Sequence, residues 1–191
     1  KWMKNIESYM GKKRPNIWIS LTCMKFMENA DGTPANGVEG GQTDIFLDDT
    51  IRANFVAEFV EYVKKYDFYG VDIDWEYPAS ADDRKVYDSF IQKLHRDLKA
   101  YKEDSIISSA LSSDALGLSK ETFDCLDQVQ FMAYDGNDED GYQSSLQQAE
   151  EGLRDFEKNG ADISKINIGI AVYGRPISVH LTGRRGARSK T

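Results

Sequence analysis

Short apolar segments alternate with longer amphipathic segments along most of this chain, and that alternation is the strongest constraint on its fold. The apolar segments are predicted strands at 16–21, 69–78, 105–111, 128–134 and 166–174. The segments between them repeat apolar residues at helical spacing and are predicted helices at 48–66, 82–101, 119–126 and 142–160. Regular alternation of strand and helix is typical of parallel βα units. We therefore expect an α/β fold in which helices cover a parallel sheet.

The composition is typical of a globular protein and argues against some classes of binding partner. The 191 residues are 40% hydrophobic and 12% aromatic, enough for one domain with a sizeable core. The net charge of −8 argues against a nucleic-acid-binding surface over the whole domain. No run of about 18 apolar residues predicts a membrane span. Cys23 and Cys125 are too few for a disulfide framework, and we expect both to be buried thiols.

The ends of the chain and one long loop differ from the rest. Residues 1–10 are predicted to form an amphipathic helix and lack the features of a signal peptide, so the compartment is not predicted. Residues 27–43 are rich in glycine, which favours a functional or mobile loop. Residues 181–191 carry four basic residues and no acidic one. We expect them to be a disordered or non-native tail after a domain at 1–180, with a nucleic-acid-binding tail as the alternative.

One predicted strand carries acids and apolar residues at alternating positions. Residues 69–78 read YGVDIDWEYP, in which the acids are Asp72, Asp74 and Glu76 and the apolar residues between them are Val71, Ile73 and Trp75. Successive side chains of a strand point to opposite faces, so the acids share one face and Trp75 belongs to the core. Helices flank this segment in sequence, which makes it a central βα unit, where unpaired charges are costly.

Three interpretations of the acidic row are open from the residues alone. The row could be the solvated face of an edge strand, or it could hold magnesium or calcium, although positions along one strand lie on a line rather than around a point. A calcium loop at 135–146 is disfavoured because Asp140 replaces its glycine and Leu146 its glutamate. In the third interpretation the acids repel one another, so at least one keeps its proton near neutral pH and can donate it to a leaving group.

Three segments together resemble glycoside hydrolase family 18, the chitinases. Residues 69–78 resemble the family signature Asp-Gly-x-Asp-x-Asp-x-Glu of the fourth barrel strand. Residues 130–135, QFMAYD, resemble the sixth-strand Met-x-Tyr-Asp, and residues 168–176, IGIAVYGRP, resemble the seventh-strand Gly-x-x-x-Tyr-Gly-Arg. The resemblance covers roughly 1–176. It implies a (β/α)8 TIM barrel, of which the chain holds the portion from the second helix to the seventh strand.

The resemblance also implies a mechanism, hydrolysis of β-1,4 bonds in chitin or N-acetylglucosamine oligomers with assistance from the substrate. Glu76 would be the general acid, Asp74 would turn toward the substrate's acetamido group, Asp72 would stabilise Asp74, and Tyr134 would hydrogen-bond the acetamido oxygen. The expected substrate-binding residues are Met132, Asp135, Tyr77, Tyr173 and Arg175. No metal, cofactor, nucleic acid or membrane is implied, and the partner is the sugar polymer.

The sequence departs from the family pattern at two motifs. The third-strand Ser-x-Gly-Gly is replaced by SLTC, with Thr22 and Cys23 in place of the glycines, so we expect that side of the cleft to be reshaped. Tyr69 replaces the first aspartate of the long signature, which we expect to be a structural loss.

The chain is also shorter than the barrel of this family, since a (β/α)8 barrel typically needs about 250 residues. The chain has five predicted strands, so we expect an incomplete barrel with open edges, exposed apolar faces and little activity in isolation. The alternative functions are a sugar-binding lectin on the same fold, disfavoured by Glu76, and an endoglycosidase for N-linked glycans, disfavoured by Trp75 and Tyr134. An inactive fragment is a further alternative.

Overall fold

In the computed structural model, the described residues are 5, 8–9, 15–22, 48–78, 80–113, 117–136 and 142–174. The strands are β1 (Trp18–Thr22), β2 (Gly70–Asp74), β3 (Ile106–Leu111), β4 (Gln128–Met132) and β5 (Ile166–Gly169). The helices are α3 (Asp49–Tyr66), α4 (Ala81–Tyr101), α5 (Lys120–Cys125) and α6 (Leu146–Lys158), with the 3₁₀ turn η2 at Ile163–Lys165. The long loop at 27–43, the tail at 181–191, Cys23, and most of residues 1–10 lie outside this part of the chain.

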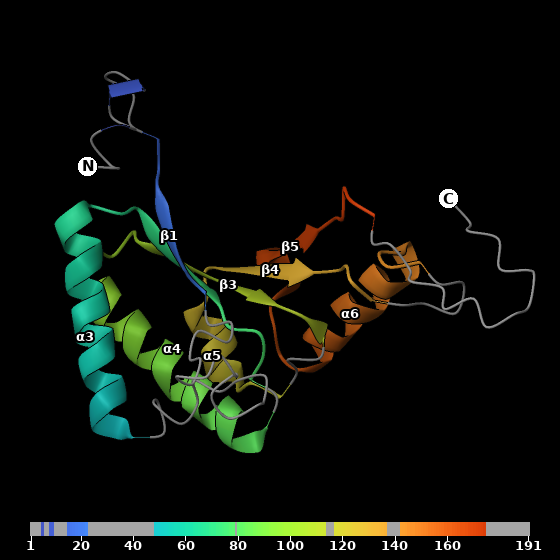
Figure 1. The fold of residues 1–191 in the computed structure, drawn as a ribbon. Coiled ribbons are helices and arrows are strands. Elements are labelled where there is room, and N and C mark those ends of the chain that lie inside the picture. Colours follow the sequence, from blue (N-terminus) through green and yellow to red (C-terminus); the bar gives the residue numbers. More distant parts are fainter. Residues whose placement is uncertain are drawn as a thin grey trace, which may run out of the picture.

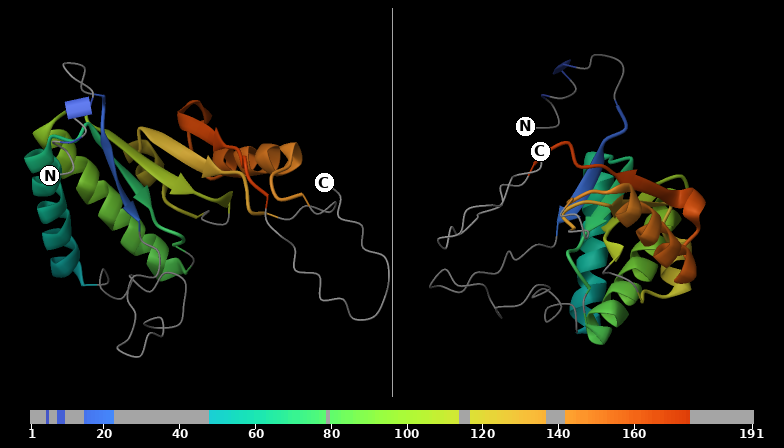
Figure 2. Two further views of the ribbon diagram at one scale, coloured as in Figure 1. Left: turned by 45° about the horizontal axis from the view of Figure 1, so that its top comes forward. Right: turned by 90° about the vertical axis from the view of Figure 1, so that its right-hand side faces the viewer.

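The described strands form one parallel sheet in the order β1-β2-β3-β4-β5 (Figure 1). Each strand pairs with the next strand in the sequence, so every connection runs in the same direction across the sheet. Right-handed crossovers of this kind place their helices on one side, and α3, α4 and α5 cover one face (Figure 2). The α/β prediction is correct, and sequential strand order is the arrangement of a barrel wall rather than of a doubly wound sheet.

The hydrophobic core lies between this sheet face and the helices. The core includes the three apolar residues that alternate with the acids, because Val71, Ile73 and Trp75 have no exposed surface. The prediction that Trp75 belongs to the core is therefore confirmed. The Cys125 thiol, expected to be buried, is only partly so at the end of α5.

Local signals set most helix starts, whereas three strands end earlier than predicted. Helix α4 begins behind a capping box in which Ser80 accepts from the backbone N–H of Asp83 and the Asp83 carboxylate accepts from that of Ser80. A second capping box starts α6 at Leu146 rather than at residue 142. Strand β2 ends at Asp74 rather than at residue 78, so Glu76 lies beyond it, and β4 ends at Met132 rather than at residue 134. Strand β5 ends at Gly169 rather than at residue 174, because its neighbour β4 ends at Met132, the residue that pairs with Gly169.

The sheet has apolar side chains in solvent at its β5 edge, as expected for an incomplete barrel. Ile168 is half-exposed, and beyond the strand Ile170 and Val172 are 75% and 96% exposed. No helix among the described ranges is both long and apolar enough to cross a membrane.

Candidate active site

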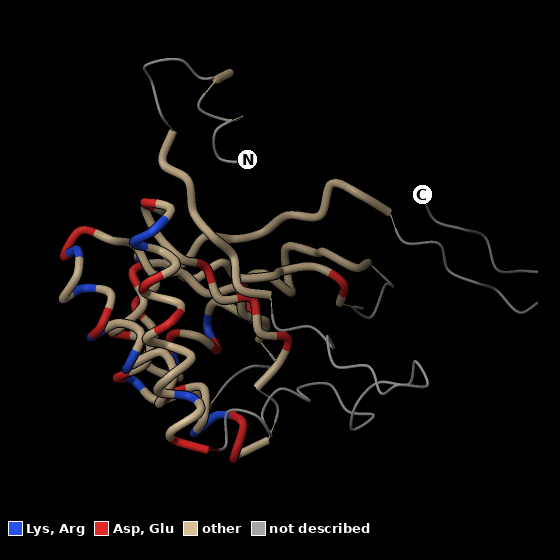
Figure 3. Tube along the Cα trace, turned by 60° about the vertical axis from the view of Figure 1, so that its left-hand side comes forward, with Lys and Arg blue, Asp and Glu red and all other residues tan. Residues whose placement is uncertain are grey.

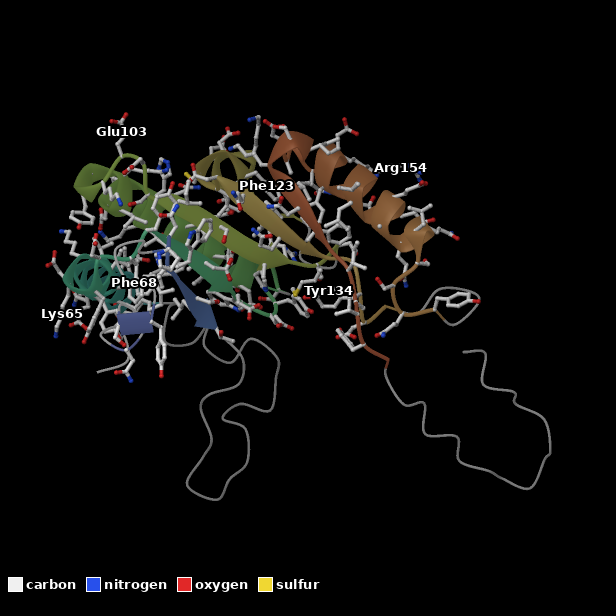
Figure 4. All side chains as sticks on the ribbon, turned by 90° about the horizontal axis from the view of Figure 1, so that it is seen from above. Lys65, Phe68, Glu103, Phe123, Tyr134 and Arg154 are labelled. Atoms are coloured by element: carbon white, nitrogen blue, oxygen red, sulfur yellow. The ribbon has the colours of Figure 1, made fainter. Side chains whose placement is uncertain are left out.

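The sequence-predicted acids lie where the strands of the sheet end. In a parallel sheet the carboxyl ends of all strands meet at one edge, which in barrel enzymes is the edge that carries the chemistry. Strand β2 ends at Asp74, and Glu76 follows two residues later. Tyr134 follows β4 by two residues and lies at this edge (Figure 4). Acidic positions occur along the sheet here, whereas the helices carry both signs of charge (Figure 3).

Asp72 is held by hydroxyl groups from the strands on both sides. Ser20 of β1 and Ser108 of β3 are its partners in the strand register, so their side chains emerge on the same face. The Ser20 hydroxyl donates to Asp72 Oδ2 over 3.0 Å, and the Ser108 hydroxyl donates to Asp72 Oδ1. Both oxygens of this carboxylate are thus fixed as acceptors on the face opposite the helices.

Asp74 is the strongly perturbed acid of the row. Burial is the main cause that raises its pKa, to about 6, followed by the negative charges of Glu76 and Asp72 and by a hydrogen bond with Glu76. A hydrogen bond that raises the pKa favours the protonated form, so the Asp74 carboxyl donates its proton toward Glu76. Asp74 therefore keeps its proton up to about pH 6, in a hydrogen bond that Glu76 accepts.

Tyr134 completes the cluster from a neighbouring element. Burial raises the pKa of its phenol, and the charges of Asp74, Glu76 and Asp135 raise it further, so the hydroxyl remains a donor at neutral pH. Its ring lies against the backbone of β5, where a Cβ on Gly169 would come within 2.9 Å of Tyr134 Cε1. The absence of a side chain at Gly169 is what admits the ring.

Asp135 and Tyr173 meet beside Tyr134. The Tyr173 hydroxyl donates to Asp135 Oδ1 over 2.8 Å, and the rings of Tyr134 and Tyr173 contact edge to face with centroids 6.2 Å apart. Gln143 joins the same group, since its Nε2 donates to the Tyr173 carbonyl over 2.7 Å. Asp135 itself has a positive φ of 59°, a conformation that aspartate tolerates better than most residues.

The other predicted substrate-binding residues differ in position and burial, and one of them lies outside the described residues. Met132 is the last residue of β4 and is partly buried. Tyr77, which follows a cis peptide after Glu76, packs partly against the core. Thr22, at the altered family motif, pairs with Asp74 in the strand register. Arg175 lies outside the described residues.

The sequence did not single out Ser108 or Gln143 as parts of the site. Ser20 carried a signal, because it is the serine of the altered Ser-x-Gly-Gly motif, whereas Ser108 becomes a partner of Asp72 only through strand register. Within the described ranges no group of three or more His, Cys, Asp or Glu side chains is arranged to hold a metal ion. A groove of about 540 Å³ lies between α3 and α4, lined by Ala57, Glu58, Val60, Glu61, Lys64, Asp97 and Ala100, and it contains none of the site residues.

Comparison with known proteins shows which family this chain matches. Residues 38–187 match the family Glycosyl hydrolases family 18. The endochitinase of Manduca sexta is 27% identical over an alignment of 155 residues, and the match covers 67% of this chain and 28% of that protein. The chain thus spans less than a third of the length of that curated relative.

Solved structures show the same fold at low sequence identity. A mutant of the class V chitinase from Nicotiana tobaccum in complex with NAG4 superposes with a TM-score of 0.67 at 17% identity, over 88% of this chain and 52% of that one. The chitinase-like agglutinin from Robinia pseudoacacia gives 0.57 at 20% identity, over 66% of this chain and 44% of that one. The predicted TIM-barrel type of α/β fold is confirmed, and the chain spans about half the length of these structures.

Proposed function

Because the chain belongs to Glycosyl hydrolases family 18, we propose that it contributes the catalytic machinery for cleaving β-1,4 bonds in chitin or N-acetylglucosamine oligomers. The observation that carries the proposal is the pair formed by Asp74 and Glu76 at the carboxyl end of β2, with the pKa of Asp74 raised by burial to about 6. A carboxyl that keeps its proton up to about pH 6 can supply that proton for acid catalysis near neutral pH.

Each member of the cluster has a role in the proposal. The proton of Asp74 passes to Glu76 along their hydrogen bond, which leaves Asp74 as a carboxylate, and Glu76 donates that proton to the glycosidic oxygen as the bond from that oxygen to the anomeric carbon breaks. Asp74, released from its hydrogen bond with Glu76, orients the acetamido group, and Asp72 supplies the neighbouring negative charge. The Tyr134 hydroxyl donates to the acetamido oxygen.

The acetamido oxygen then forms the new bond to the anomeric carbon, which gives an oxazolinium ion. The attacking atom is already part of the substrate, so the protein needs only to orient it and to balance the positive charge that develops. Water next bonds to the anomeric carbon while the bond to the acetamido oxygen breaks, and the Glu76 carboxylate takes the proton from that water. Two inversions at one carbon give net retention.

The flanking residues supply the sugar-binding surface in this proposal. Met132, Tyr77 and the linked pair Asp135 and Tyr173 would line the subsite that holds the acetamido-bearing sugar, with Arg175 beside them. The complex of a class V chitinase with NAG4 supports an oligomer of this sugar as the ligand.

Sugar binding without hydrolysis is the second candidate. The structural similarity to a chitinase-like agglutinin supports it. Glu76 favours hydrolysis, because a binding protein has no use for a proton donor beside a perturbed carboxyl.

The deciding experiment measures both binding and hydrolysis of chitotetraose by this sequence within a completed barrel, because we expect the incomplete barrel alone to show little activity. We expect Glu76→Gln to lower the hydrolysis rate by about 10² to 10⁴ while binding persists. Glu103→Gln is the matched control, because Glu103 is exposed and follows α4, away from the site. Equal hydrolysis by Glu76→Gln and the unchanged completed protein would overturn the assignment of Glu76, and binding by the unchanged completed protein without hydrolysis would favour the second candidate.

A further inference from the structure

Two buried hydroxyl groups support β2 from its helix-facing side. The Ser109 hydroxyl of β3 donates to the backbone carbonyl of Ile73 over 2.8 Å. The Tyr87 hydroxyl of α4 is hydrogen-bonded to the same Ser109 oxygen. A serine hydroxyl has one proton, which Ser109 gives to Ile73, so Tyr87 is the donor to Ser109. Tyr87 and Ser109 have no exposed surface.

Tyr87 also contacts the acidic segment directly. Its ring packs against Trp75 with centroids 5.7 Å apart and an interplanar angle of 59°. Ile73 and Trp75 are the neighbours of Asp74 on either side in the sequence. Tyr87 therefore reaches the residue before Asp74 through Ser109 and the residue after it through ring contact.

These contacts occur where the regular support of β2 stops. The pairing of β2 with β3 ends at Ile73 and Ser109, one residue before Asp74. Residues 75–78 have no regular secondary structure, and Glu76 lies within them. The Ser109 hydroxyl thus adds a hydrogen bond at the last rung of the β2–β3 ladder, immediately before the two acids.

We propose that Tyr87 and Ser109 are positioning residues that fix the backbone around Asp74 and thereby hold its carboxyl against Glu76. The proposal rests on the function proposed for this site. Misplacement of a reacting group by about 1 Å can cost about 100-fold in rate. A buried network that fixes the Ile73 carbonyl and the Trp75 ring on either side of Asp74 would prevent such a displacement.

Ordinary core packing is the alternative role for these residues, and the two roles differ in what they do to Asp74. Loss of packing lowers stability and leaves the Asp74–Glu76 pair as it was. Loss of positioning lets the pair separate and water enter, which lowers the pKa of Asp74 because burial and Glu76 are the first two causes that raise it. Asp72, on the same strand, is the other charge that raises the pKa of Asp74, and Asp74 in turn raises the pKa of Tyr134, which follows β4.

The test is a carboxyl ¹³C NMR titration of the chain and three variants. We expect Ser109→Ala and Tyr87→Phe each to lower the pKa of Asp74 by about half a unit or more. Ser105→Ala is the matched control, because Ser105 is also fully buried beside β3 while its hydroxyl has no hydrogen-bond partner among the described residues. This control should leave the pKa of Asp74 unchanged.

Two results would overturn the proposal. One is an unchanged pKa of Asp74 in both Ser109→Ala and Tyr87→Phe, and the other is an equal change in the Ser105→Ala control. Tyr87→Phe keeps the ring against Trp75 and so keeps the test available if Ser109→Ala does not fold. The titration needs no turnover, so failure of the proposed function, seen as absent hydrolysis, is distinguishable from failure of the positioning role.

Discussion

The carboxyl of Asp74 is hydrogen-bonded to Glu76 at the carboxyl end of β2, where burial and the charges of Glu76 and Asp72 raise its pKa to about 6. Asp72 in turn accepts hydroxyl protons from both neighbouring strands. The three acids therefore differ in their surroundings: Asp72 is fixed by hydroxyl donors, whereas Asp74 keeps its proton in a hydrogen bond to Glu76.

Removing the charge of either neighbour should lower the pKa of Asp74 by unequal amounts. Glu76→Gln should lower it more than Asp72→Asn, because Glu76 has the larger electrostatic effect and also accepts the hydrogen bond. Burial, the leading cause, persists in both variants, so the pKa should stay above that of an ordinary aspartate, about 3.9. NMR titration of the Asp74 carboxyl measures both changes, and a larger fall in Asp72→Asn would contradict this order.

The raised pKa of Asp74 also predicts how stability depends on pH. An unfolded aspartate titrates near 3.9, so between about pH 4 and 6 the folded chain binds this proton more tightly than the unfolded chain. The contribution of Asp74 to stability is full below about pH 4 and is lost as pH rises through about 6. Asp74→Asn should therefore raise the free energy of unfolding at pH 7.5, by about 1 kcal/mol after allowance for solvent screening, and raise it less at pH 4.5.

Urea unfolding of both proteins at the two pH values measures this difference. The comparison between variant and unchanged chain removes the effects of titrating groups that do not interact with Asp74. A gain that is larger at pH 4.5 than at pH 7.5 would show that the pKa of Asp74 is lowered, not raised.

Gly169→Ala should displace the ring of Tyr134. The new Cβ would lie 2.9 Å from Tyr134 Cε1 and 3.0 Å from the Phe131 carbonyl oxygen, both closer than ordinary contact. We expect a stability loss of about 1 kcal/mol and, under the proposed function, a fall in the hydrolysis rate. Gly174→Ala is the control, since no atom of the described residues lies within 4 Å of the Cβ it would add. Equal rates for the two variants would mean that the position of Tyr134 does not matter.

Gly152→Ala should destabilise α6 although alanine is the better helix former. Helix propensity alone predicts a gain of about 1 kcal/mol. Here the Cβ would come within 2.1 Å of Phe131 Cζ, in the core beneath the helix, and overpacking of this kind costs about 1 to 3 kcal/mol. Gln147→Ala, on the exposed side of α6, should change stability little. Thermal unfolding compares the two, and a higher melting temperature for Gly152→Ala would contradict the packing.

The sequence predicted the order of strands and helices because apolar periodicity acts over short segments. It also separated the two faces of β2, since alternation alone puts Trp75 in the core. The sequence did not predict interactions across the sheet, because Ser108 lies 36 residues from Asp72 and the two meet only through strand register. The network from Tyr87 through Ser109 to Ile73 was missed for the same reason: a buried serine in an apolar run has no local signal.

The most direct test of the account is the anomeric configuration of the sugar first released from chitotetraose, followed by ¹H NMR before mutarotation. Attack by the substrate's own acetamido oxygen, with Glu76 as the proton donor, predicts the β-anomer as the initial product. An initial α-anomer would show that water attacks the anomeric carbon directly, and it would contradict the account.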